Sequence, residues 1–197
     1  MYIYLSDIRN ISDETFDKYY QLSHENTKAK IDFKKNTDDK KRILCKEALV
    51  SELLNMRGLT CKDILFSPLG KPYVTHPDIF FSVSHSKNLV ACIFSQVETG
   101  IDIEASRKVP NPVIARFFNK TEKEKDPLKI WTKKEALSKA FGSGLTNKIL
   151  KTDVSENSVR FLNDTYYFKT VAINEYTISI CNRAPIDDIS IAYKDIK

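Results

Sequence analysis

The chain has 197 residues, with 31 lysines and arginines against 26 acidic residues and a formal net charge of +5 at pH 7. Its 42% hydrophobic and 29% charged residues are typical of a globular protein and exclude disorder as its main state. No apolar run approaches the roughly 20 residues needed to cross a bilayer, and the first residues lack the regions of a signal peptide. We therefore expect a cytoplasmic protein without a membrane partner.

Positive charge is concentrated in two segments of the chain. Residues 28–46 contain eight lysines and arginines against three acidic residues, and residues 107–134 contain nine against three. Such segments can attract nucleic acid, an acidic protein or a phosphorylated small molecule. Solvated helix faces rich in lysine would give the same pattern, so charge alone does not choose a partner.

The first half of the chain combines one long helix with three strands. Apolar residues spaced by three and four predict a helix over Thr37–Arg57, with Thr37 or Asp38 as its N-cap and Gly58 at its end. Pro68, Gly70 and Pro72 indicate a turn. Runs of β-branched and aromatic residues predict the three strands, which are residues 1–8, 80–84 and 89–94.

The second half begins at a short junction, residues 96–100, and repeats this composition. Asp126 and Pro127 predict the start of a helix that ends at Phe141, before Gly142, and Thr121 with Glu124 forms a capping-box pattern. The predicted strands are residues 99–104, 158–162, 166–173, 176–182 and 189–193. We therefore expect an α+β protein of two similar, pseudo-symmetric halves, residues 1–98 and 99–197, each with a helix packed on a mostly antiparallel sheet.

Two acidic residues share one face of the strand Ile101-Asp102-Ile103-Glu104. Because side chains alternate along a strand, Asp102 and Glu104 point to the same side, about 7 Å apart. Two carboxylates so placed can converge on a cation. A half-exposed strand with acids facing water would look the same.

The predicted helix over residues 127–141 carries two stripes. Ile130, Leu137 and Phe141 form an apolar stripe, and Trp131, Glu135 and Lys139 form a second one at successive turns. Glu135 would supply a third carboxylate to a metal, and Lys139 would meet a phosphate bound to that metal. Carboxylate and phosphate oxygens favour Mg²⁺. The alternative is an ordinary surface pair of Glu and Lys one turn apart.

A histidine lies at a predicted strand end between two hydroxyls, in the run Phe81-Ser-Val-Ser-His-Ser86. His85 with Ser84 can bind phosphate oxygens, although an isolated histidine is more often structural.

The ordered motifs GKP, FSVSHS, GIDIE, RFFNKTE and WTKKEALSKAFGSGL resemble those of the 4′-phosphopantetheinyl transferases of the Sfp type. The resemblance implies a monomer of two similar α+β halves that binds coenzyme A in the cleft between them. Such an enzyme moves the phosphopantetheine arm of coenzyme A to a serine of an acyl, peptidyl or polyketide carrier protein and releases 3′,5′-ADP.

The resemblance also implies roles for individual residues. Asp102, Glu104 and Glu135 would hold Mg²⁺, and Lys139 would contact the phosphates and assist the leaving group. Glu135 would be the base, with Glu122 as the alternative. The residues implied in binding coenzyme A, besides Lys139, are Lys28, Lys30, Arg42, Lys71, Pro72, Ser84 and His85.

Two other functions remain open. A metal-dependent nuclease would also need acids and a lysine, but its carboxylate and lysine usually lie two apart on a strand, whereas Glu135 and Lys139 lie four apart on a predicted helix. A non-catalytic nucleic-acid-binding protein would explain the basic segments, yet no reader motif or aromatic platform accompanies them. We expect no nucleic-acid partner.

Overall fold

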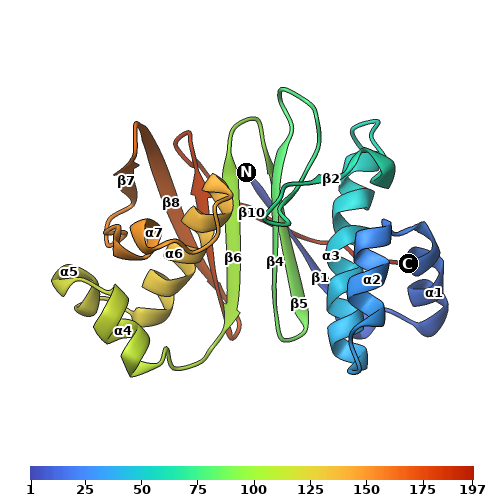
Figure 1. Cartoon of the computed structure of the whole chain (residues 1–197), viewed down its shortest axis with the longest axis horizontal. Helices are drawn as coiled ribbons and strands as arrows, with labels where there is room; N and C mark the ends of the chain where they lie inside the picture. The colour runs from blue at the N-terminus through green and yellow to red at the C-terminus, as the bar shows by residue number, and fades with distance from the viewer.

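The chain is arranged in four layers, in the order helix, sheet, sheet, helix (Figure 1). The computed structural model describes residues 1–197. Helices α1 to α3 cover the outer side of one sheet, and α4 to α7 lie on the outer side of the other. Apolar residues from both sheets, such as Leu5, Ile93, Ile103 and Ile178, form one of three buried cores. The other two cores lie beneath α3 and α6.

The helices and strands follow one another with short connections. The helices are α1 (Asp13–Leu22), α2 (Glu25–Asp32), α3 (Thr37–Asn55), α4 (Asn111–Phe117), α5 (Lys120–Lys123), α6 (Pro127–Phe141) and α7 (Asn147–Lys151). The strands are β1 (Tyr2–Asp7), β2 (Leu65–Phe66), β3 (Pro72–Tyr73), β4 (Phe80–Ser86), β5 (Leu89–Ser95), β6 (Thr99–Ala105), β7 (Ser158–Phe161), β8 (Asp164–Ile173), β9 (Tyr176–Asn182) and β10 (Ser190–Tyr193). None of the helices combines the length and apolar character needed to span a membrane.

The two halves of the molecule share one connectivity. In the first, β1, α3, β4 and β5 follow in the chain and the strands lie side by side in the order β1-β5-β4. In the second, β6, α6, β8 and β9 follow in the chain and the strands lie in the order β6-β9-β8. Every strand pair is antiparallel except β1 with β10. The predicted α+β fold of two similar halves, each with a helix on a mostly antiparallel sheet, is confirmed.

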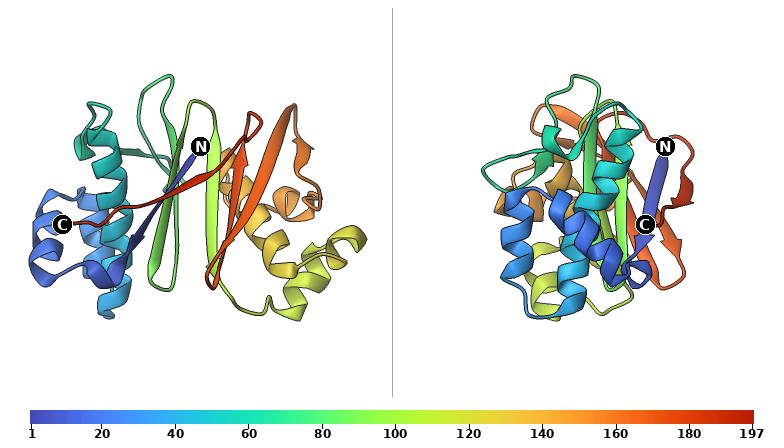
Figure 2. Two further views of the ribbon diagram at one scale, coloured as in Figure 1. Left: turned by 180° about the vertical axis from the view of Figure 1, so that it is seen from behind. Right: turned by 90° about the vertical axis from the view of Figure 1, so that its right-hand side faces the viewer.

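The C-terminal segment leaves the second half and returns to the first sheet. Strand β10 pairs in parallel with β1, and the left view of Figure 2 shows the C-terminal segment crossing in front of the strands from the second half to the first. Ile196 is buried in the core beneath α3. The first sheet is therefore completed by the end of the chain, and the division into residues 1–98 and 99–197 stays a prediction.

Both long helices lie where the sequence predicts them, but two caps differ. The N-cap of α3 is Asn36, whose side chain accepts a hydrogen bond from the Asp39 amide, so the prediction of Thr37 or Asp38 is wrong. The reason is that Asn36 keeps an extended backbone while both predicted residues already lie in the first turn. The predicted capping box at Thr121 and Glu124 is also wrong, since the observed pair is Asn119 and Glu122.

Helix α6 ends as predicted but its apolar stripe is shorter than expected. Gly142 caps it with φ of 79°, a left-handed conformation that glycine adopts without strain. Ile130 and Leu137 are buried, whereas Phe141 is 42% exposed and packs edge-on against Phe161.

Strand β6 and helix α6 approach each other unusually closely at Gly100. A Cβ atom at this position would lie 2.0 Å from the Ala136 carbonyl oxygen and 2.4 Å from the Ala140 amide nitrogen. Only glycine fits here, and the alanines on the facing side of α6 keep the contact short. The contact fixes α6, which carries Glu135 and Lys139, directly against the strand that carries Asp102.

We expect Gly100→Ala to lower the free energy of unfolding by about 1–3 kcal/mol or more, because the added methyl group overlaps helix backbone atoms that have no room to move. The measurement is urea unfolding followed by far-UV circular dichroism. A Gly100→Ala chain as stable as the parent would show that β6 and α6 are less tightly packed than this contact requires.

Candidate active site

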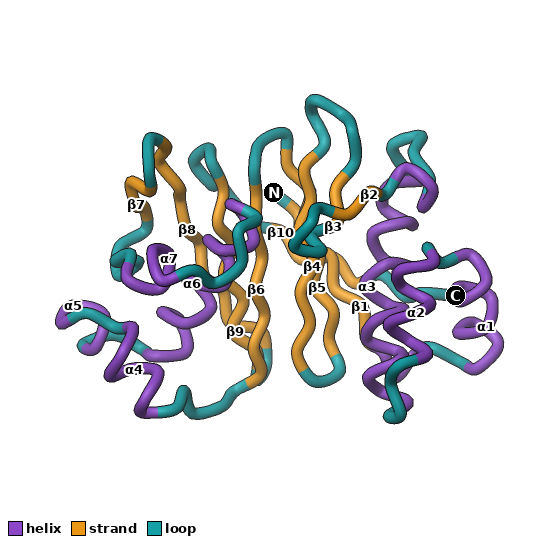
Figure 3. Tube along the Cα trace, in the orientation of Figure 1, coloured by secondary structure: helices purple, strands orange, loops and turns teal.

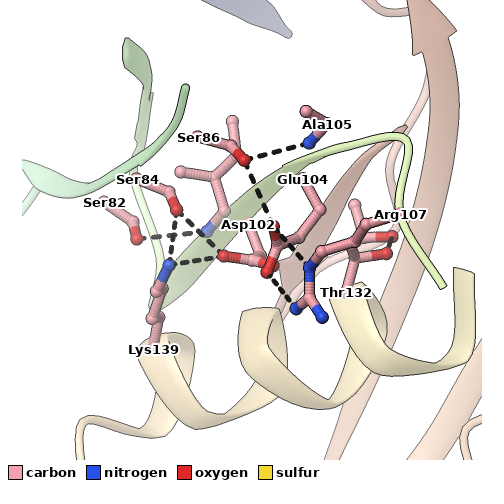
Figure 4. Close-up of polar contacts among 11 residues, drawn as sticks. Ser82, Ser84, Ser86, Asp102, Glu104, Ala105, Arg107, Thr132 and Lys139 are labelled. Atoms are coloured by element: carbon pink, nitrogen blue, oxygen red, sulfur yellow. Dashed lines mark hydrogen bonds and ion pairs between the residues drawn. The ribbon is translucent and has the colours of Figure 1, made fainter. Parts of the chain in front are cut away.

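Three serines on one face of β4 join the two sheets. Strands β4 and β6 run side by side at the centre of the molecule (Figure 3), although they belong to different sheets. Because side chains alternate along β4, Ser82, Ser84 and Ser86 all face β6. The Ile101 amide donates to the Ser82 hydroxyl at 3.1 Å, and the Ala105 amide donates to the Ser86 hydroxyl at 3.0 Å (Figure 4). These bonds fix β6 against β4.

The middle serine takes part in a three-residue contact between β4, β6 and α6. The Lys139 ammonium donates to the Ser84 hydroxyl at 2.6 Å and to Asp102 Oδ1 at 2.7 Å, and Ser84 donates to the same Oδ1 at 2.9 Å (Figure 4). The Asp102 side chain is only 7% exposed, while that of Lys139 is 29% exposed. Ser84 of the first half therefore contacts both members of a charged pair of the second half.

The second strand carboxylate lies at the outer edge of the same site. Glu104 accepts hydrogen bonds from the Ser86 hydroxyl at 3.2 Å and from the Arg107 guanidinium at 2.7 Å and 3.2 Å. Ser82, Ser86 and Arg107 were not predicted from the sequence as site residues. The alternation of serines in FSVSHS would have revealed the first two.

Burial and neighbouring acids raise the pKa of two carboxyl groups here. Burial followed by the charge of Asp102 raises the pKa of Glu135 to about 7, and Lys139 only partly opposes the shift. Burial also raises the pKa of Asp102, despite its contacts with Lys139 and Ser84. Three carboxylates, including Glu104, thus lie close enough to repel one another.

The carboxylate oxygens at this site are ligands of the kind that a hard cation prefers. No group of three or more His, Cys, Asp or Glu side chains is arranged to hold a metal ion, and the two strand carboxylates are instead paired with Lys139 and Arg107. Asp102 Oδ2, however, is buried without a hydrogen-bond partner. A buried, unpartnered carboxylate oxygen beside two further carboxylates fits a divalent cation that prefers oxygen ligands.

A cavity of about 320 Å³ opens beside this cluster, between the two halves. Four residues that the sequence analysis assigned to coenzyme A line it: Lys30, Lys71, Pro72 and Lys139. The Lys71 ammonium donates to the Ala140 carbonyl at 3.0 Å, which ties the turn before β3 to the end of α6. Burial lowers the pKa of Lys71. The cavity is therefore lined by lysines from both halves.

A second, more open cavity of about 630 Å³ adjoins the first and shares Lys30, Ile43 and Lys46 with it. His85 lines this second cavity. Loss of solvation, then repulsion from Lys46, Lys139 and Arg42, lowers the pKa of His85 although its side chain is exposed, so its imidazole is neutral at pH 7. Lys46 was missed by the sequence analysis, although it lies one helical turn after Arg42.

Three predicted residues, Lys28, Arg42 and Glu122, neither line a cavity nor take part in the contacts around Asp102. The Lys28 ammonium pairs with Glu25 at 3.0 Å, and the Arg42 guanidinium pairs with Asp39 at 2.5 Å. Glu122, which is 1% exposed, is paired with Lys134 at 2.7 Å in the second half.

The surroundings of Glu122 are those of a structural residue. It accepts hydrogen bonds from the Asn119 and Val154 amides, and Lys134 also donates to the Leu150 and Thr152 carbonyls. The structure does not bring Glu122 to the cluster around Asp102.

Known proteins with similar sequences identify the family. Residues 98–181 match the model of the 4′-phosphopantetheinyl transferase superfamily. The chain is 30% identical over 185 residues to the 4′-phosphopantetheinyl transferase Sfp of Bacillus subtilis strain 168, covering 81% of this chain and 83% of that protein. It is 32% identical over 124 residues to the transferase gsp of Aneurinibacillus migulanus, covering 56% of this chain and 52% of that one.

This chain belongs to the 4′-phosphopantetheinyl transferase family. A further relative, the transferase ffp of Bacillus subtilis, is 29% identical over 153 residues, covering 70% of this chain and 68% of that one. The functional prediction from the motifs, a 4′-phosphopantetheinyl transferase, is confirmed, and the relatives favour it over the nuclease and nucleic-acid-binding alternatives.

We expect Glu135→Gln to raise the free energy of unfolding at pH 8 by about 1 kcal/mol or more, because it removes a carboxylate whose ionised form is disfavoured in the folded state. The unfolded carboxyl ionises near 4.5 and the folded one near 7, so the parent loses stability as the pH rises between these values. Urea unfolding at pH 4 and pH 8 measures the effect, with exposed Glu124→Gln as the control. A variant less stable than the parent at pH 8 would contradict the raised pKa.

Proposed function

We propose that this chain moves the phosphopantetheine arm of coenzyme A to a serine hydroxyl of a carrier protein and releases 3′,5′-ADP. The observation that carries the proposal is the position of the lysine-lined cavity directly beside the carboxylate cluster, with Lys139 belonging to both. Coenzyme A carries a diphosphate and a 3′-phosphate, and a cationic cavity offsets their charge.

The lining residues support a binding mode for coenzyme A. Lys139 reaches the cavity from the second half, Lys71 from the turn before β3, and Lys30 from α2. We assign Pro72 to the part of the cavity that would hold the nucleotide of coenzyme A. We assign His85 with Ser84 to the 3′-phosphate. Arg42 and Lys28 are the remaining proposed contacts, although neither lines a cavity and each pairs with an acidic neighbour.

We assign the metal site to Asp102, Glu104 and Glu135, with Mg²⁺ as the ion. When bound, the ion supplies positive charge that neutralises the diphosphate of coenzyme A. The free Oδ2 of Asp102 and the mutual repulsion of the carboxylates support this assignment.

The reaction needs a base, an acceptor and a stabilised leaving group. Glu135 takes the proton of the carrier serine as its oxygen forms a bond to the phosphorus that bears pantetheine. The bond from that phosphorus to the bridging oxygen of the diphosphate breaks, and 3′,5′-ADP leaves with the electron pair. Lys139 donates to the phosphate oxygens on which charge develops. The buried pairing of Glu122 with Lys134 supports Glu135 rather than Glu122 as the base.

The partner is an acyl, peptidyl or polyketide carrier protein, and the chain acts as a monomer in the cytoplasm. Both sides of the lysine-lined cavity come from one chain, from residues in the proposed halves 1–98 and 99–197, which supports a monomeric enzyme.

Intact-mass analysis tests the proposed reaction. We expect a carrier protein from a mixed panel of apo forms to gain one phosphopantetheine arm when incubated with this chain, coenzyme A and Mg²⁺, and to gain none in the presence of EDTA. Asp102→Asn and Glu135→Gln should each slow the gain at least about 100-fold, because each removes a ligand or the base.

Glu124→Gln is the matched control, since Glu124 is exposed on the segment just before α6. It should transfer at the parent rate. Unimpaired transfer by the Asp102 or Glu135 variant would refute the assignment of the site, and transfer that persists in EDTA would refute the metal requirement.

A further inference from the structure

Lys46 is a cation without a partner at the junction of the two cavities. It lies on α3, is partly buried and lines both cavities. Its ammonium makes no ion pair and no hydrogen bond within the chain, unlike Lys41 on the same helix, which donates to the Ile11 carbonyl at 2.6 Å. A partly buried ammonium group that lacks a counter-ion is unfavourable unless something outside the chain supplies one.

The groups around Lys46 repel it. Burial and then the charges of Lys139, Lys30 and Lys34 lower the pKa of Lys46 to about 8. Arg42 also belongs to this cationic surrounding, and its charge, like that of Lys46, lowers the pKa of His85.

The two acids that line the cavities do not compensate Lys46. Asp39 pairs with Arg42, and Glu47 accepts hydrogen bonds from the His24 amide and the Thr27 hydroxyl. The cavities around Lys46 therefore hold excess positive charge, which a bound anion would balance.

Arg42, one turn before Lys46, is engaged elsewhere. Its Nε donates to the Lys87 carbonyl at 2.6 Å and holds α3 to the turn between β4 and β5, and a second guanidinium nitrogen pairs with Asp39 on the same helix. Among the cations of α3, Lys46 thus lines both cavities and remains free for a ligand there.

We propose that Lys46 binds the 3′-phosphate of coenzyme A and sets the preference for coenzyme A over its 3′-dephospho form. This inference rests on the proposed function. Lys46, His85 and Lys34 line the second cavity together. The carboxylate cluster instead lies beside the first cavity, on the side where Lys139 lines it. A phosphate monoester carries close to two negative charges at neutral pH, which is more than each phosphate of the diphosphate carries. The 3′-phosphate therefore best offsets the positive charge around Lys46.

Calorimetric titration with both ligands tests the role of Lys46. We expect Lys46→Met to weaken coenzyme A binding at least about tenfold, the effect of one charge-assisted hydrogen bond, and to change binding of 3′-dephospho-coenzyme A less than about threefold. Lys40→Met, the same change on the same helix outside both cavities, should leave both affinities at the parent value.

The outcomes separate the two proposals. Equal losses for both ligands, or no loss, would overturn the role of Lys46 while leaving the transferase function intact. Failure of the parent chain to bind either ligand would instead refute the proposed function.

A pH series gives an independent readout that a purely structural lysine would not produce. We expect the preference of the parent for coenzyme A to decline between about pH 7 and pH 9, because the Lys46 ammonium loses its proton near 8 in the free chain. Lys46→Arg should keep the preference across this range, since a guanidinium stays charged. A parent whose preference does not change with pH would contradict the assignment.

Discussion

The contact of Lys139 with Asp102 and Ser84 is the interaction on which the active site depends. It joins α6 and β6 of the second half to β4 of the first, and it lies at the wall of the cavity between them. Removing the lysine would leave the buried Asp102 carboxylate without a counter-charge, which is costly inside a protein. The same ammonium lines the cavity where it can meet the phosphates of a ligand. One side chain therefore stabilises the fold and is also available for binding.

Close packing gives this contact its geometry. Gly100 lets β6 reach the backbone of α6, and the serines of β4 fix the other side of β6 through backbone amides. The strand and helix that carry the acidic groups are thus held from two directions. The raised pKa of Glu135 indicates that the arrangement costs stability, as expected for charged groups gathered for binding and catalysis rather than for folding.

The sequence predicted most of the site because the residues lie on regular elements. Alternation in β6 and the helical spacing in α6 place Asp102, Glu135 and Lys139 without knowledge of the tertiary structure. Helices α1 and α2 were not predicted, since they present few buried residues and are stabilised by packing against α3. Pairing of β10 with β1 was missed because no local pattern indicates which strand a distant segment joins.

Errors about single side chains have a similar origin. Glu122 was a candidate base from its motif alone, but it is buried and paired with Lys134, which is next to Glu135 in α6 and is itself fully buried. Lys46 was not predicted because its proposed role depends on the contacts that the neighbouring acidic residues make. Asp39 and Glu47 are already occupied, a fact that only the folded chain reveals.

A crystal structure of the chain grown with coenzyme A and Mg²⁺ would test most directly where the reaction takes place. We predict that coenzyme A fills the cavity lined by Lys30, Lys71 and Lys139, with its diphosphate beside Asp102 and Glu135. Coenzyme A bound elsewhere on the surface, with this cavity empty, would contradict the placement of the active site between the two halves.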